Sequence, residues 1–299
     1  MNFKKIGIVV ATGLTGITLA SCGKNSADSD IITMKGDTIR VSDLYKETKE
    51  FPTTGASILL QNMTFNKIFG KEFGKKVSDK DVTKEFDSQK KSLGSNFASA
   101  LQQAGYTENS YKDSIRSQLL LKQAVVNDIK FTDDLYKSTF ETYHPEVSAY
   151  VVSEATEDAA KAKIADAQKN ASDFDATAKK ANAQISFDSS SASVPTEVMT
   201  AAFKLKDGEV SQAPVSVTNP QTGAPAFYVI KMIKNADKGT DWKKYKSELK
   251  EVIIKNKQAD TSFVNSVITK YLKQYNVKVK PTEFSNTFSA FESTPGTSK

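Results

Sequence analysis

The acid-base and nucleophilic chemistry open to this chain is limited, because its 299 residues include one histidine, His144. A lone histidine cannot form a multi-histidine metal site or act as a general base beside a second histidine. We interpret it as a boundary residue before Pro145. Ser153, Ser172 and Ser193 have no histidine in a triad context and fit caps and turns instead. No glycine-rich phosphate loop is present, so we expect no catalytic residue of these kinds, no metal and no cofactor.

The strongest chemical signal lies at Cys22, the only cysteine. Lys4 and Lys5 precede an apolar stretch, residues 6–20, that is too short to span a bilayer. This order is typical of a cleavable secretory signal. The residues Leu-Ala-Ser-Cys that end at position 22 resemble the bacterial lipobox, whose cysteine receives a diacylglyceryl group and becomes the new N-terminus. The alternative is a free thiol in an ordinary secretory signal.

These features predict a lipoprotein signal peptide over residues 1–21, lipid attachment at Cys22 and a flexible tether over residues 22–30. The protein would then be extracytoplasmic, lipid-anchored at the outer face of the cell membrane, since two or more acyl chains give stable anchoring. Without a second cysteine no intramolecular disulfide can form, so stability must come from the core.

The charge balance is mildly basic, with 41 Lys and Arg against 35 Asp and Glu. Loss of residues 1–21 would remove two lysines and no acidic residue, which lowers the formal charge from +6 to +4. Charges of both signs alternate along the expected helices, which argues against nucleic acid as a partner. The basic excess favours contact with anionic lipid or wall polymer.

Residues 31–143 are expected to be mostly helical. They begin with alternating apolar and polar residues around Gly36, a pattern typical of a short hairpin. Helical periodicity follows. Ser78 with Asp81 matches a capping box at the start of one helix, and another helix is expected near Thr107.

Residues 144–235 differ in composition and predict a compact α/β domain. The expected elements, in chain order, are a strand at 147–152, helices at 156–170, from 172 and from 195, and strands at 215–217 and 227–233. Ser172 is expected to cap the second of these helices, and Pro195 suits an early position of the third.

Residues 236–283 return to helical periodicity over a length that predicts either one long helix or two with a break near Asp260. Residues 276–280 alternate like an edge strand. Residues 284–299, rich in Ser, Thr, Pro and Gly, are expected to be disordered. The helical segments on either side of residues 144–235 are expected to pack together, with the α/β domain inserted between them.

This order of parts resembles the PrsA family of foldase lipoproteins, which are parvulin-type peptidyl-prolyl isomerases, and more distantly the periplasmic chaperone SurA. The matching strings are those from Gly36 to Tyr45, from Gly74 to Val82 (GKKVSDKDV) and from Ala201 to Ser211 (AAFKLKDGEVS). The resemblance implies an α+β fold. A mostly helical SurA-like chaperone domain would be formed by residues 31–143 and 236–283, with a parvulin-like domain inserted at 144–235.

The resemblance also implies where a peptide would bind. In the family, a histidine in the first strand and one in the last strand of the parvulin domain lie in the core of the site. The matching positions here are Ala149 and Tyr228. A Met and a Phe of the family's proline pocket match Val194 and Val198, which with Phe203 and Tyr228 are the candidates for peptide binding. The family's Gly-Gly-Asp-Leu-Gly loop has no counterpart, so we expect weak or no isomerase activity.

The function implied is that of a membrane-anchored foldase or chaperone that assists secreted proteins of a Gram-positive cell after translocation. Its expected partners are unfolded or newly secreted proteins and, through the lipid anchor, the membrane. A homodimer is allowed. Two alternatives stay open, an active parvulin-type isomerase and a solute-binding lipoprotein, of which the second requires two α/β lobes.

Aromatic residues recur at helical spacing, and we expect most of them in the core. The alternative is that some line an open crevice for non-native chains, because such a surface needs exposed apolar groups framed by charge. These residues are Phe65, Phe69, Phe73, Trp242 and Tyr245.

Overall fold

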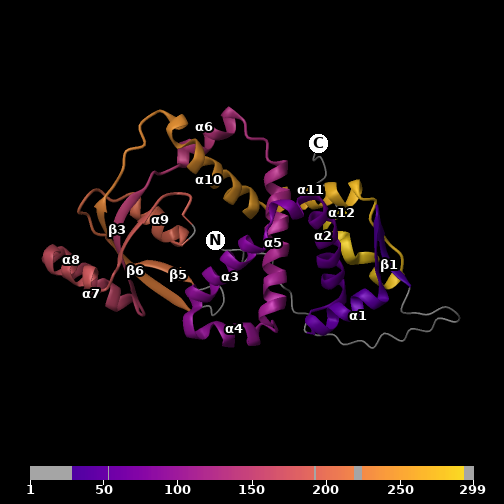
Figure 1. The fold of residues 1–299 in the computed structure, drawn as a ribbon. Coiled ribbons are helices and arrows are strands. Elements are labelled where there is room, and N and C mark those ends of the chain that lie inside the picture. The colour runs from indigo at the N-terminus through magenta and orange to yellow at the C-terminus, as the bar shows by residue number, and fades with distance from the viewer. Residues whose placement is uncertain (1–28, 53, 192, 219–223, 293–299) are drawn as a thin grey trace. The chain divides into compact units, whose positions relative to one another are not determined.

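The computed structural model describes residues 29–52, 54–191, 193–218 and 224–292 (Figure 1). The expected signal peptide, the lipid-attachment residue Cys22 and the tether as far as residue 28 lie outside the described residues, as does the end of the tail from residue 293. Among the helices of the described ranges, none has the length and apolarity needed to cross a membrane.

The chain forms two compact units. The first, here called the helical unit, contains the described residues up to Ile129 and those from Lys257 onward. The second, here called the sheet unit, contains residues 130–256. The sheet unit is therefore longer than the domain expected at residues 144–235, and the independent folding of that shorter segment stays a prediction.

The helical unit contains a three-stranded sheet and most of the helices. Its elements are β1 (Asp30–Met34), β2 (Asp37–Arg40), α1 (Val41–Glu50), α2 (Ala56–Phe73), η2 (Gly74–Lys76), α3 (Asp79–Leu93), η3 (Gly94–Asn96), α4 (Phe97–Gln103), α5 (Glu108–Asp128), α11 (Thr261–Gln274), β7 (Lys278–Val279), η5 (Thr282–Phe288) and α12 (Ser289–Glu292). The expected hairpin is confirmed. Its turn contains Gly36 at φ +77°, a left-handed conformation that favours glycine.

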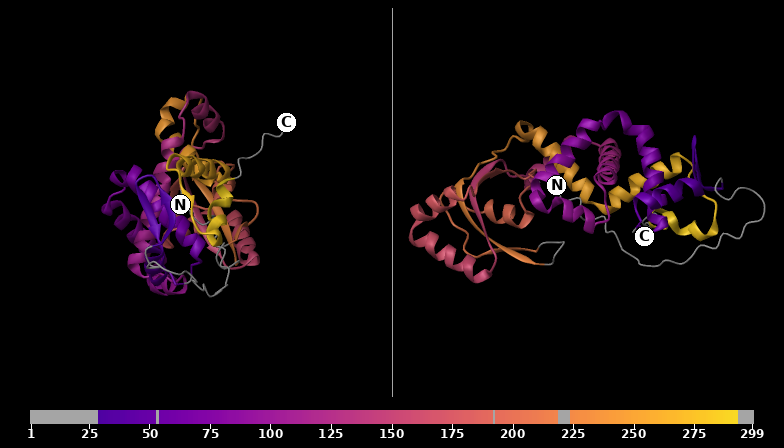
Figure 2. Two further views of the ribbon diagram at one scale, coloured as in Figure 1. Left: turned by 90° about the vertical axis from the view of Figure 1, so that its right-hand side faces the viewer. Right: turned by 60° about the horizontal axis from the view of Figure 1, so that its bottom comes forward.

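The two ends of the chain share one sheet and one core in the helical unit. The strand order is β2-β1-β7, and Ile32 of β1 lies between Ile39 and Val279 in the antiparallel register. Helix α2 buries one face, on which the ring of Phe69 packs edge to face against Tyr271 of α11 at 5.4 Å between centroids. The N-terminal and C-terminal segments therefore fold together (Figure 2).

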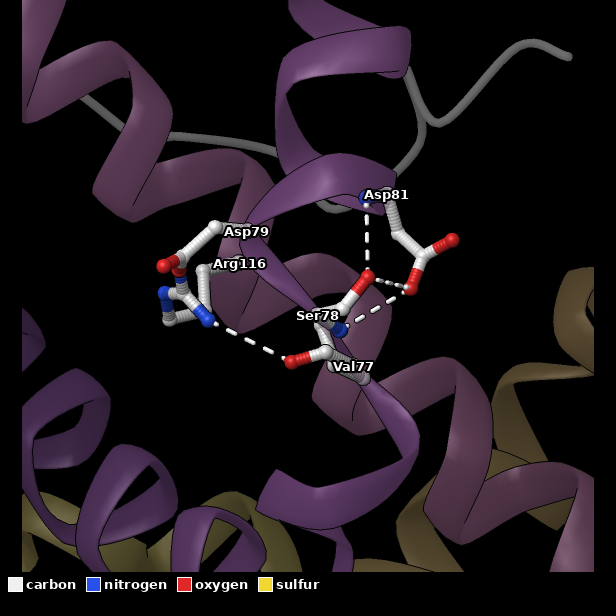
Figure 3. A network of polar contacts seen from close by, with 5 residues as sticks. All are labelled: Val77, Ser78, Asp79, Asp81 and Arg116. Carbon is white, nitrogen blue, oxygen red and sulfur yellow. Dashed lines mark hydrogen bonds and ion pairs between the residues drawn. The ribbon is translucent and has the colours of Figure 1, made fainter.

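The start of α3 shows how local sequence fixes a helix boundary (Figure 3). The Ser78 hydroxyl accepts a hydrogen bond from the Asp81 backbone N–H at 3.2 Å, and the Asp81 carboxylate accepts from the Ser78 N–H at 2.9 Å. The predicted capping box is thus confirmed, and hydrogen bonds from Ser78 lower the pKa of the Asp81 carboxyl. Arg116 of α5 adds a non-local tie: it donates to the Val77 carbonyl at 3.4 Å and pairs with Asp79.

The segment expected to be disordered from residue 284 is helical as far as it is described. Residues 284–292 belong to η5 and α12. Phe288 is buried in the core of the helical unit, with Phe284 and Phe291 packed against the same core. The three rings repeat at intervals of four and three residues, which places them on one side of a helix. Their burial outweighs the disorder-prone Ser and Thr between them.

The sheet unit is built around four antiparallel strands in the order β4-β3-β6-β5. Its elements are α6 (Asp133–Thr142), β3 (Val147–Glu154), α7 (Glu157–Lys169), α8 (Ala171–Lys180), β4 (Gln184–Phe187), α9 (Thr196–Ala202), β5 (Val215–Thr218), β6 (Pro225–Lys234), η4 (Trp242–Tyr245) and α10 (Lys246–Ala259). Helices α7 and α8 cover one face of the sheet and α9 covers the other (Figure 1).

Two local expectations are corrected or decided by the structure, and one strand was missed. Helix α8 begins at Ala171 and is capped by Asn170, whose side chain accepts from the Asp173 N–H at 3.3 Å, and not by Ser172. Strand β4 was not predicted. The long C-terminal helix is broken, since the Asp260 carboxylate caps α11 by accepting from the Phe263 N–H at 3.1 Å.

A lysine ties the chain that enters the sheet to the chain that leaves it. The ammonium group of Lys238, which follows β6, donates to the carbonyl oxygens of Phe140 at 2.7 Å, Glu141 at 2.7 Å and Tyr143 at 3.1 Å. These carbonyls lie at the C-terminal end of α6, where a helix leaves acceptors unsatisfied and favours a positive charge. Lys238 therefore caps α6 from a segment far along the chain.

Candidate peptide-binding face

The five residues that the sequence assigned to the site come together on one face of the four-stranded sheet. Ala149 of β3 and Val198 of α9 are fully buried, and Val194 is buried beside them. Phe203, directly after α9, and Tyr228 of β6 are half-buried and pack against the same cluster. Phe203 and Tyr228 thus offer surface to a ligand, whereas Val194 and Val198 shape the floor beneath it.

The register of the central strands decides which residues share this face. Ala149 pairs with Met232, and Ser153 pairs with Tyr228. Because side chains alternate across a strand, these residues point to the same side of the sheet. Ala149 and Tyr228 therefore lie on one face, but Tyr228 is opposite Ser153, four residues along β3 from Ala149.

Part of this face remains open beyond α9. Four side chains pack on the buried cluster around Ala149 and Val198 but stay half-buried: Val151, Val215, Val217 and Tyr228. The sequence did not single out the three valines, although the alternation Val-Ser-Val-Thr of β5 was a signal for a strand with one apolar face. We call these four residues the open strip. Its chemistry is contact with apolar side chains, because the phenol of Tyr228 is its one polar group.

The single histidine lies at the edge of the same face and not merely at a domain boundary. The imidazole of His144 stacks on the ring of Phe203, with 4.2 Å between centroids and 4° between planes. Its main chain exchanges two hydrogen bonds with Ser189, from the His144 N–H to the Ser189 hydroxyl at 2.7 Å and from the Ser189 N–H to the His144 carbonyl at 3.1 Å. The Nδ1 atom of His144 is buried without a hydrogen-bond partner.

The loop after β4 is held by polar contacts within it and by a lysine of α10. Asp188 accepts hydrogen bonds from the Ser190 N–H at 3.0 Å and from the Ser191 hydroxyl at 3.0 Å. Lys255 of α10 donates to the Ser191 carbonyl at 3.1 Å. Burial, the charge of Asp188 and a hydrogen bond to that carboxylate raise the pKa of Tyr143. The loop is thereby fixed at the end of the sheet where His144 and Phe203 stack.

The comparisons with known proteins decide the family. No protein-family model matches the chain. A foldase protein PrsA of Lactococcus lactis is 51% identical over 307 aligned positions, which cover 100% of this chain and 99% of the relative. The chain belongs to the PrsA foldase family.

Other members of the PrsA family agree in length and in fold. A foldase protein PrsA of Streptococcus gordonii is 40% identical, with 97% of each chain covered. The crystal structure of PrsA from Lactococcus lactis matches with a TM-score of 0.66 at 50% identity, over 89% of this chain and 100% of that one. The structure from Streptococcus pneumoniae gives 0.66 at 35% identity, over 88% and 100%. The expected α+β fold is therefore confirmed, and the structure has it as mostly helical with an antiparallel four-stranded sheet.

Within the described residues of this PrsA family member, no group of three His, Cys, Asp or Glu side chains is placed to hold a metal ion. The ionisable side chains described on the candidate face are the His144 imidazole, stacked at its edge, and the Tyr228 phenol.

We expect the stability of the sheet unit to depend on pH through His144. Burial lowers the pKa of His144 from its usual value of 6.5. The charge of Lys238 acts in the same direction, and the nearby backbone of Pro145 and Phe203 opposes both effects. Below pH 6.5 the unfolded chain binds the proton first, so stability falls from its full value as the pH drops from 6.5 toward the folded-state pKa. The measurement is the denaturant midpoint followed by Trp242 fluorescence.

His144→Phe is the control for this expectation, because a phenyl ring can keep the stack on Phe203 while removing the titrating group. The variant should show a flatter midpoint between about pH 7.5 and about pH 5.5, where histidine titrates. An equal slope in both proteins would contradict the assignment to His144.

Proposed function

We propose that the chain is a membrane-anchored, extracytoplasmic foldase that holds newly secreted proteins in non-native form and does so without efficient prolyl isomerisation. The observation that carries the proposal is the open strip, an apolar surface of half-buried side chains on a rigid sheet. Such a surface suits extended, unfolded chains, which expose apolar groups that a folded protein would bury. Membership of a foldase family implies that the substrates are proteins.

The absence of efficient isomerisation is inferred from the residues at the family's histidine positions. Ala149 offers only a methyl group and is fully enclosed. Tyr228 is displaced from it by the register of β3 and β6. Catalysis of rotation about a prolyl amide bond needs groups that stabilise the twisted transition state more than the ground state. Ala149 and Tyr228 cannot replace a hydrogen-bonded pair of imidazoles in that role.

Two alternatives remain beside this proposal. An active isomerase is implied by the resemblance to parvulin-type isomerases and is tested directly below. A solute-binding lipoprotein would need two lobes of strand-helix repeats. The described residues instead form one three-stranded and one four-stranded antiparallel arrangement, which disfavours that role.

The membrane anchor, the tether and the inserted layout of residues 144–235 between 31–143 and 236–283 are parts of the same proposal. The lipobox-like residues that end at Cys22 carry the first of these. A homodimer stays a prediction, to be measured as the molar mass of the mature chain in solution.

We expect the protein to suppress client aggregation without catalysing prolyl isomerisation, and both activities can be measured in one sample. Uncatalysed prolyl isomerisation takes roughly tens to hundreds of seconds, so a client whose refolding is limited by that step reports catalysis directly. The slow phase should keep its rate to within about twofold, while aggregation of the client is suppressed at equimolar ratio. Acceleration of about tenfold at catalytic concentration would show an active isomerase.

A matched pair of variants tests the open strip itself. Val217→Asp places a carboxylate on the strip, where burying it without a partner opposes contact with an apolar client. Ser216→Asp adds the same charge one residue earlier, on the exposed opposite side of β5. Aggregation suppression should fall several-fold in the first variant only, with circular dichroism showing that both fold. An equal loss in both variants would contradict client binding at this strip.

A further inference from the structure

A second surface of the sheet unit combines stacked aromatic rings with unpaired lysines. Tyr136 of α6 stacks on Trp242 of η4 at 5.4 Å and 11° between planes, and on Phe131 at 6.2 Å and 28°. Tyr136 is buried, whereas Phe131 and Trp242 are half-exposed. Two of the three rings, those of Phe131 and Trp242, are therefore partly accessible to solvent, and the third is enclosed.

Lysines of α10 lie directly over this row. The Lys246 ammonium is 5.4 Å from the centre of the Tyr136 ring, and the Lys250 ammonium is 5.4 Å from the centre of the Phe131 ring. Both side chains are exposed. Their ammonium groups therefore lie beside the rings at the protein surface, where they stay accessible to water.

The segment that carries these lysines has an excess of positive charge. Residues 238–250 include five lysines and two acids, Asp241 and Glu248. The Asp241 carboxylate is already engaged, since it accepts from the Lys243 backbone N–H at 3.1 Å. Lys243, Lys244, Lys246 and Lys250 form no ion pair with any of the described residues. We call these four lysines with Phe131 and Trp242 the aromatic-lysine face.

We propose that the aromatic-lysine face binds the surface of an anionic lipid bilayer, independently of any lipid attached at Cys22. Tryptophan and other aromatic rings suit the headgroup level of a bilayer, where one part of the ring is apolar and its edge is wet. Lysines beside them are attracted to anionic headgroups within a Debye length. A client chain would be held by apolar contact and needs no anion, which is why four lysines without counterions favour the lipid.

The proposed anchor would keep the chain near a bilayer, a point that rests on the proposed function. Between Cys22 and Asp30 the sequence has seven residues, at most about 25 Å of extended chain. An anchored molecule therefore always lies near the bilayer, and weak contact through a second surface would fix its orientation at little entropic cost.

The test uses the mature chain without residues 1–21 and with Cys22→Ser, so that no lipid is attached and failure of the anchor proposal leaves the result untouched. Trp242 is the only tryptophan of the chain, so its fluorescence reports from the face itself. With vesicles of equal parts phosphatidylglycerol and phosphatidylcholine we expect co-sedimentation and a blue shift of Trp242 emission. Both should disappear with pure phosphatidylcholine and in about 1 M salt, where the Debye length is near 3 Å.

Two charge-matched variants locate the binding. Changing Lys243, Lys244, Lys246 and Lys250 to Gln should reduce co-sedimentation at least tenfold. The control changes the same number of exposed lysines of the helical unit to Gln, namely Lys75, Lys80, Lys84 and Lys91. This control should bind the vesicles as the parent does, and both variants should keep the parent's circular dichroism spectrum.

Three results would overturn the proposal. They are equal binding to neutral vesicles, equal loss of binding in the two variants, and sedimentation with anionic vesicles without a change in Trp242 emission. A blue shift caused by an acidic unfolded protein, with none caused by the anionic vesicles, would also overturn it and would assign the face to clients.

Discussion

Cys22→Ala is expected to release the protein from the membrane fraction into the medium almost completely. The reason is that the proposed acyl chains at Cys22 would be lost, and with them the attachment that the lipobox-like residues imply. Two or more chains bind stably, whereas contact through lysines alone is reversible and sensitive to salt. The measurement is the fraction of protein that sediments with membranes after a wash in about 1 M salt, together with incorporation of labelled fatty acid.

Ser21→Ala serves as the matched control, since it keeps a small residue before the cysteine and should leave both readings unchanged. Full membrane retention of Cys22→Ala after the salt wash would show that another segment holds the protein, and the anchor proposal would then fail.

Phe69→Ala is expected to destabilise the helical unit by about 3–5 kcal/mol, the usual cost of removing a buried phenyl ring. Phe69 is 1% exposed. Its ring contacts Tyr271 of α11 edge to face at 5.4 Å and stacks near Phe65 at 5.9 Å. The lost contacts therefore join the N-terminal and C-terminal segments, and their energy reports on the shared core. The measurement is the free energy of unfolding from the denaturant transition of the far-ultraviolet dichroism.

Tyr45→Ala is the control for this prediction, because Tyr45 is 62% exposed and such changes usually stay within about 0.5 kcal/mol. Trp242 lies in the sheet unit, so its fluorescence follows that unit separately. A Phe69→Ala transition that shifts no more than that of Tyr45→Ala would contradict a core shared by the two ends of the chain.

The elements that could be predicted from the sequence are those that depend on residues close together along the chain. The capping box at Ser78 and Asp81, the turn at Gly36 and the break at Asp260 each depend on residues within a few positions of one another. Strand β4 was missed although Gln-Ile-Ser-Phe alternates polar and apolar residues, because the strand is only four residues long and lies at the sheet edge. Asn170 was missed as the cap of α8 because Ser172, with an acid after it, matched the same pattern.

The candidate face could be predicted only in part, and the reason is sequence separation. The resemblance placed Val198, Phe203 and Tyr228 together, and the structure has them on one face of the sheet. The stack of His144 on Phe203 joins residues that no local pattern relates, as does the contact of Lys255 with the loop after β4. The rings from residue 284 onward did have a visible helical spacing, which the polar residues between them obscured.

The hydrogen bonds of Lys238 have a mechanical consequence. Ser148, near the start of β3, pairs with Lys234 at the end of β6. Tension on the chain at these two neighbouring points would open the central strand pair like a zipper, one hydrogen bond after another, which is the weakest direction for a sheet. Lys238 joins the two strands of chain outside that point, at Phe140, Glu141 and Tyr143. A force carried along the backbone must therefore break the hydrogen bonds of Lys238 before it reaches the first hydrogen bonds between β3 and β6.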